Sequence, residues 1–152
     1  MKASRNAKAA IGAICLLAAT FQRVQSSDIQ PAVLTIKVEN VSLQGGALQI
    51  ALYDEAGYGG HDQRPVAKVV VDARAPETVV KIPNVRPGAY AVKMFQDFHR
   101  TGSFAMSALG VPEEPFGFSN DARPLLDQPA FDRAKFVVFG GETSIVVHLQ
   151  LL

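Results

Sequence analysis

Asp97, His99 and Ser119 are the residue types that hydrolases combine as acid, base and nucleophile, and they fall in one region of the chain. A serine becomes a nucleophile when a histidine accepts its proton and a carboxylate orients that histidine. Ser119 lacks the Gly-x-Ser-x-Gly turn that exposes the nucleophile in many such enzymes. A hydrolytic or metal-dependent enzyme that uses these three residues is therefore the alternative hypothesis, and a non-enzymatic function is favoured.

The segment Pro115-Phe116-Gly117-Phe118-Ser119-Asn120 offers a different chemistry, which is binding. Two aromatic side chains that flank a glycine can form a stiff platform for a sugar ring or a peptide. In the competing interpretation, Phe116 and Phe118 close one end of the core while Ser119 and Asn120 cap a turn. The second interpretation is favoured, because a domain without tryptophan needs its phenylalanines in the core.

Metal and cofactor sites find little support in the residue pattern. The three histidines, His61, His99 and His148, show no ligand spacing such as His-x₃₋₅-His, which predicts solvent-facing side chains and, for His148, a surface position. Glu113 and Glu114 are adjacent in a proline-bounded loop and are interpreted as solvated charge. We therefore predict no metal ligands and no cofactor.

Residues 1–26 have the pattern of a secretory signal peptide. A basic start precedes the apolar run Ala9–Ala19, which is too short to span a bilayer, and cleavage is expected after Ser26 or nearer Thr20. Removal of the signal also removes four basic residues and the single cysteine, and it changes the net charge from +1 to −3. The pattern predicts a secreted or periplasmic protein that binds no nucleic acid and does not insert into a membrane.

The remaining residues, 27–152, are predicted to form a single β-domain. Seven short segments alternate apolar and polar residues or are rich in β-branched residues, with Gly- or Pro-containing turns between them: 33–39, 48–52, 66–73, 78–82, 89–95, 134–139 and 143–149. This pattern favours an all-β fold, a seven-stranded antiparallel β-sandwich, with a small barrel as the alternative. Residues 96–128 interrupt the pattern as a long irregular insertion between strands five and six.

Two segments resemble known families. Asn84–Val92 (NVRPGAYAV) is similar to a strand of transthyretin-like and carboxypeptidase-regulatory-like sandwiches. Leu109–Ala122 (LGVPEEPFGFSNDA) resembles a block of the bacterial domain-of-unknown-function family 2141, and the likeness extends over about 33–149. The resemblance implies a secreted or periplasmic transthyretin-like (prealbumin-like) β-sandwich and carries no established activity.

The chain departs from that family in the loop before this block. Members often have an Asp- and Asn-rich loop with the spacing of a calcium site. In this chain Asp97 and Gly102 remain, whereas the other ligand positions are occupied by His99, Thr101 and Ala105. Since calcium needs about six to eight oxygen ligands, we predict that this loop does not hold the ion.

The primary hypothesis is an exported, non-enzymatic β-sandwich module that binds an unidentified protein or small ligand through the insertion. It predicts that the insertion is ordered and partly apolar on its outer face. The candidate binding residues lie before the family-like block and within it: Asp97, His99, Pro115, Phe116, Phe118, Ser119 and Asn120.

Overall fold

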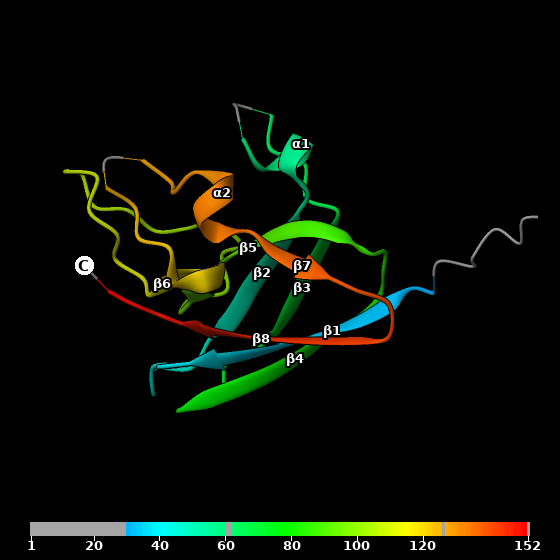
Figure 1. The fold of residues 1–152 in the computed structure, drawn as a ribbon. Coiled ribbons are helices and arrows are strands. Elements are labelled where there is room, and N and C mark those ends of the chain that lie inside the picture. Colours follow the sequence, from blue (N-terminus) through cyan, green and yellow to red (C-terminus); the bar gives the residue numbers. More distant parts are fainter. Residues whose placement is uncertain (1–29, 60–61, 126, 152) are drawn as a thin grey trace, which may run out of the picture.

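The computed structural model describes residues 30–59, 62–125 and 127–151. The predicted signal peptide and His61 lie outside this part of the chain. Eight strands dominate the fold, with two single-turn helices and one 3₁₀ turn (Figure 1). In chain order the elements are β1 (Ala32–Glu39), β2 (Ala47–Tyr53), α1 (Glu55–Tyr58), β3 (Ala67–Asp72), β4 (Glu77–Val85), β5 (Gly88–Asp97), β6 (Phe116–Phe118), η1 (Ser119–Asp121), α2 (Phe131–Ala134), β7 (Phe136–Val138) and β8 (Glu142–His148).

The strands form two sheets. One has the order β4-β1-β8, and the other has the order β3-β2-β5-β6, with β7 also paired to β5. The prediction of an all-β fold is confirmed. The prediction of seven strands, all antiparallel, is wrong in two respects: β6 is an additional strand, and β8 runs parallel to β1. Three residues are too few to show a period of two, and strand direction depends on contacts between distant segments.

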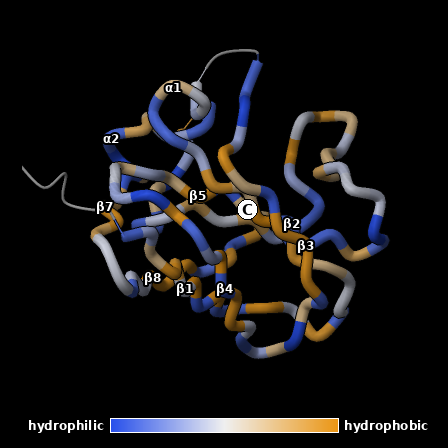
Figure 2. The backbone as a smooth tube through the Cα atoms, turned by 90° about the vertical axis from the view of Figure 1, so that its right-hand side faces the viewer, coloured by the Kyte–Doolittle hydropathy of each residue, from blue (hydrophilic) through white to orange (hydrophobic). Residues whose placement is uncertain are grey.

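The alternation in the sequence correctly gives the buried face of each long strand. Apolar side chains of both sheets form one buried cluster, and hydrophobic positions recur along the strands of each sheet (Figure 2). The predicted inward residues are all part of this cluster or packed against it: Leu34, Ile36, Val38, Leu48, Ile50, Leu52, Val80, Ile82, Tyr90, Val92, Met94, Ile145, Val147 and Leu149. The opposite face of the second sheet is therefore free to line a site.

Strand β6 links the two sheets. It pairs with β5, and Phe116 also exchanges two backbone hydrogen bonds with Gln150, just after β8, at 2.9 and 2.8 Å. Gly117 permits this close approach, because a Cβ atom at that position would lie 2.9 Å from the carbonyl oxygen of His148. The middle of the insertion thus belongs to the sheet framework, contrary to the predicted irregular stretch.

The rest of the insertion is also ordered by local contacts. Residues 105–113 form a finger in which Met106 bridges Pro112 and the amide of Glu113 donates to the carbonyl of Ala105. Its tip exposes Leu109, whose side chain is 91% accessible, together with Met106 and Val111. This agrees with the predicted apolar outer face. Among the residues that the structure describes, no helix is long and apolar enough to cross a bilayer.

Candidate functional site

Asp97 ends β5, is fully buried and organises the loop that follows it. Its carboxylate accepts hydrogen bonds from the backbone amides of Thr101 (2.9 Å) and Gly102 (2.7 Å) and from the side-chain amide of Gln49 (3.1 Å). Burial alone would raise the pKa of the Asp97 carboxyl, but the hydrogen bonds outweigh burial and the pKa is lowered. The carboxylate oxygens are thus surrounded by N–H donors that hold the loop.

Glu114 is a second buried carboxylate in this region, and here the interpretation as solvated charge is wrong. The side chain is 2% exposed and accepts from the backbone amides of Phe98 and Ala105, each at 3.0 Å. These bonds connect both ends of the loop to the segment that leads into β6. This role could not be predicted from the sequence, because the loop that supplies the donors has no periodic pattern.

Ser119 and Asn120 bind the backbone of distant segments. The buried Ser119 hydroxyl donates to the carbonyl oxygen of Ala134 and accepts from the amide of Val92 at 2.8 Å. Asn120 has a φ of 57° and donates from its side chain to the carbonyl oxygen of Lys135 at 2.6 Å. Both side chains thus join η1 to the C-terminal end of α2, 15 residues further along the chain, and neither makes the local bond that caps its own turn.

The three residues of the enzyme hypothesis are not joined by contacts in the described residues. His99 is exposed in the loop after β5, and no hydrogen bond or ion pair of its side chain is present in this part of the structure. The hydrogen-bond partners of Asp97 and Ser119 are different residues. Within residues 30–59, 62–125 and 127–151, no group of three His, Cys, Asp or Glu side chains is arranged to hold a metal ion.

Phe116 and Phe118 lie in an aromatic row on the outer face of the second sheet. Phe104 packs against Phe95 at 5.3 Å and against Phe116 at 5.6 Å between ring centroids, and Phe116 meets Phe118 at 6.1 Å. Phe116 is buried and Phe118 is half-buried. Pro115 is buried beside them and accepts a backbone hydrogen bond from Gln96. The rings therefore stabilise one another edge to face and leave one side of the row open.

That open side borders a pocket of about 390 Å³ on the outer face of β3, β2, β5 and β6. Ala51 of β2 lies directly between Lys68 of β3 and Lys93 of β5 in the strand register, and Lys93 is in turn opposite Phe118 of β6. All four residues line the pocket. The hollow exists because a methyl group occupies the middle of this row while longer side chains stand on both sides.

Lys93 is the unusual group in the pocket. Its ammonium group donates to the carbonyl of Tyr58 (2.9 Å) and to the side-chain oxygens of Gln63 (2.8 Å) and Gln128 (2.5 Å). The same nitrogen lies over the Tyr53 and Tyr58 rings, 4.5 and 4.1 Å from their centroids. Burial lowers the pKa of Lys93 to about 8, although the charge of Asp127 acts in the opposite direction.

Sequence reasoning did not identify this lysine. The alternation of Tyr90, Val92 and Met94 placed Lys93 on the outer face, where a lysine normally extends into water. The groups that surround it come from Tyr58, Gln63 and Gln128, about 30 residues or more away in the chain. A lysine between outward-facing aromatic positions of neighbouring strands is the signal that could have drawn attention to it.

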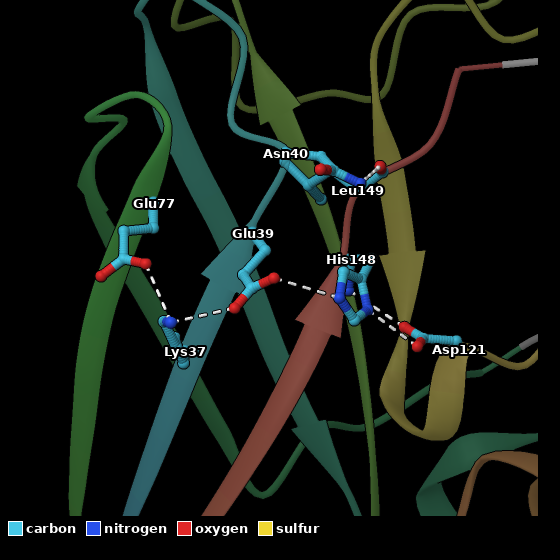
Figure 3. A network of polar contacts seen from close by, with 7 residues as sticks. All are labelled: Lys37, Glu39, Asn40, Glu77, Asp121, His148 and Leu149. Atoms are coloured by element: carbon cyan, nitrogen blue, oxygen red, sulfur yellow. Dashed lines mark hydrogen bonds and ion pairs between the residues drawn. The ribbon is translucent and has the colours of Figure 1, made fainter.

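A charged network lies on the outer face of the other sheet (Figure 3). Lys37 pairs with Glu39 and Glu77 at 2.9 Å each, and the His148 ring contacts Glu39 at 3.2 Å and Asp121 at 2.8 Å. The hydrogen bond to Asp121 raises the pKa of His148, and the negative charge of Glu39 acts in the same direction. The expected surface position of His148 is confirmed, but its ring links β8 to β1 and to η1.

The comparisons with known proteins give a family and no function. A family model described as an uncharacterized protein conserved in bacteria, DUF2141, matches residues 36–146, more than two thirds of the chain. No curated protein and no solved structure gives a significant match. The resemblance to this family noted in the sequence is confirmed.

Proposed function

Because the chain belongs to DUF2141, a bacterial family without an assigned activity, we propose its function from its own geometry: it is an exported, non-enzymatic module that binds a small ligand in the pocket over Ala51. The transthyretin-like description of the fold and the export by residues 1–26 are parts of the same proposal. Their support is the NVRPGAYAV segment and the basic, then apolar, start of the chain.

The pocket carries the proposal, because the insertion contributes to its walls. Phe104, Phe116, Phe118 and Gln128 come from residues 96–128, whereas Ala51 and Lys93 come from the sheet. A volume of about 390 Å³ falls in the range of roughly 300–1,000 Å³ that small-molecule sites occupy. An apolar wall with a few polar groups is also the usual composition of such sites.

The enzyme alternative has weaker support from the same residues. A nucleophilic serine needs a base that accepts its proton, whereas the Ser119 hydroxyl already donates to a backbone carbonyl and is fully buried. The Asp97 carboxylate is engaged by amide donors instead of by a histidine.

Binding of the neutral dye N-phenyl-1-naphthylamine, which fluoresces in apolar sites, tests the proposed function. We expect saturable binding by the wild-type chain and at least about tenfold weaker binding by Ala51→Leu, since leucine fills the hollow. Ala89→Leu is the matched control, because Ala89 is exposed on the same strand as Lys93 but outside the pocket. Equal binding by wild type and Ala51→Leu would contradict the proposal, provided that circular dichroism shows both to be folded.

A further inference from the structure

The charged side chains that line the pocket are all positive. Lys68 and Lys93 are its charged lining residues, and no Asp or Glu lines it among the residues that the structure describes. The polar remainder of the lining consists of the side-chain amides of Gln49, Gln63 and Gln128 and the phenol of Tyr53. A cationic ligand would meet two positive groups and no carboxylate, whereas an anionic ligand would meet complementary charge.

The two lysines also lack carboxylate partners in the described structure. Lys37, Arg100 and Lys135 each form an ion pair with an acidic side chain at 2.6 to 2.9 Å. Neither Lys68 nor Lys93 does so within the same set of residues. Lys93 instead donates to three neutral oxygens, and the charge of Asp127 acts on it without an ion pair between them, so its positive charge is only partly compensated. A site with uncompensated charge favours a ligand that supplies the opposite charge.

The spacing of the lysines sets the size of the group between them. Lys68 and Lys93 flank Ala51 on the two neighbouring strands, so their backbones are about 10 Å apart, twice the normal spacing of paired strands. The methyl group of Ala51 forms the floor at the midpoint. This spacing leaves room over the floor for a flat ring system between the two lysines.

The aromatic row supplies the complementary apolar wall. Phe95, Phe104, Phe116 and Phe118 present ring faces and edges beside the row Lys68–Ala51–Lys93. Aromatic ligands pack against such rings in offset or edge-to-face geometry.

We infer that the ligand class of this pocket is a small aromatic anion, a carboxylate or sulfonate on one or two fused rings, held between Lys68 and Lys93 over Ala51. This inference rests on the proposed function, because it names the ligand of the same pocket. It assigns Lys68 to direct contact with the anion and the four phenylalanines to recognition of the ring. Lys93, whose three N–H donors are already bound to protein oxygens, attracts the anion through its charge alone.

Two dyes of matched ring structure test the inference. 8-Anilinonaphthalene-1-sulfonate is an aromatic anion, and N-phenyl-1-naphthylamine is the same ring system without the sulfonate. We expect the wild-type chain to bind the anion at least about tenfold more tightly, since a hydrogen bond between charged groups is stronger than one between neutral groups. Lys68→Met and Lys93→Met should each reduce that preference by about threefold or more and change binding of the neutral dye by less than about twofold.

Lys81→Met is the control, because Lys81 is exposed on β4 of the other sheet. Lys68→Met is the cleaner of the two test variants, since the Lys68 side chain makes no hydrogen bond within the described residues. Thermal melts establish that each variant is folded, because partly folded proteins also bind the anionic dye. Preference for the anion should also fall above pH 8, where Lys93 loses its proton, while Tyr58, with a pKa of about 12, stays neutral.

The outcomes separate this inference from the proposed function. If the wild-type chain bound both dyes with equal affinity and Ala51→Leu bound neither, the assignment of an anionic ligand would be overturned. The proposal of a ligand-binding module would remain. Absence of binding of both dyes to the folded wild-type chain would overturn both. A preference for the anion that persists in Lys68→Met and Lys93→Met would place the anion site elsewhere on the molecule and refute the assignment.

Discussion

Replacing Asp97 by asparagine tests whether its carboxylate acts as the anchor of the loop after β5. Each carboxylate oxygen accepts one backbone hydrogen bond, Oδ1 from the amide of Thr101 at 2.9 Å and Oδ2 from the amide of Gly102 at 2.7 Å. Asparagine has nearly the same shape but only one acceptor oxygen. Whichever way its amide turns, its NH₂ group faces one of the two backbone N–H donors, and the other bond loses its charge assistance.

The expected loss of stability follows from these two bonds. One backbone N–H left without an acceptor in a partly buried position costs about 1–2 kcal/mol, and the weakening of the second bond costs about 1 kcal/mol more. The free energy of unfolding should therefore fall by about 2–3 kcal/mol. For a domain of this size that corresponds to a decrease in Tm of roughly 10 °C.

Urea denaturation of wild type and Asp97→Asn at several pH values measures the effect and its origin. Because the pKa of Asp97 is lowered in the folded protein, its contribution is present above the unfolded value of 3.8 and is lost as the pH falls through the folded value. The difference between the two proteins should shrink in acid. Asp132→Asn is the control, since Asp132 is exposed and pairs only with Lys135 among the described residues, and it should lose less than about 1 kcal/mol. An Asp97→Asn variant as stable as wild type at pH 7 would refute the anchoring role.

Three further substitutions have expected outcomes. Ser119→Ala removes a buried hydroxyl that satisfies two backbone groups, and we expect a loss of about 2–4 kcal/mol in urea denaturation; a loss below about 0.5 kcal/mol would show that the hydroxyl is dispensable. Gly117→Ala places a methyl group 2.9 Å from the carbonyl oxygen of His148 and should destabilise the fold by about 1–3 kcal/mol, whereas an unchanged Tm would contradict the close approach. The raised pKa of His148 predicts stability that is present below its unfolded value of 6.5 and lost as the pH rises through the folded value. His148→Gln should therefore be less stable than wild type by up to about 1 kcal/mol at pH 5.5 and nearly equal at pH 8.5, and a constant difference would exclude the titration as its cause.

The strands could be predicted because their pattern is local. In β1 the alternation of Leu34, Ile36 and Val38 with polar neighbours requires one buried face, and the structure buries all three. The partners of each strand could not be predicted in this way, since alternation fixes a face and not a neighbour. The parallel pairing of β8 with β1 depends on which edge of β1 remains open after β4 has paired with it.

The insertion was harder to predict because its order comes from side chains that bind backbone. Glu114 and Asp97 each accept two or more amide hydrogen bonds from residues 98–105, and neither has an apolar period around it. A buried carboxylate in a loop looks identical in sequence to a solvated one. The difference appears only when the donors of the folded loop are known.

The pocket could not be predicted from the sequence either. Each residue of the row Lys68–Ala51–Lys93 belongs to a different strand, and each is unremarkable in its own segment. The sequence analysis singled out Phe116 and Phe118 and considered two roles for them, closing one end of the core or forming a binding platform. Neither ring belongs to the cluster between the two sheets, so the expected closure of one end of the core is not found: Phe116 is buried in an aromatic row on the outer face, whose open side borders the pocket.

The loop anchor and the pocket are physically coupled. Asp97 fixes the amide of Gly102, and Gly102 and Phe104 both line the pocket. Arg100 lies between Asp97 and Gly102 in the sequence. Its side chain donates to the carbonyl of Gly46 at 3.0 Å and pairs with Asp72, which ties the loop to the start of β2 and to the end of β3. A loop of this length without such bonds would sample many conformations and present no fixed wall. Asp97 therefore contributes to binding through the position of Phe104. Asp97→Asn should weaken binding of the neutral dye as well as binding of the anionic one. If only binding of the anionic dye became weaker, Asp97 would act on the charge of the pocket and not on its shape.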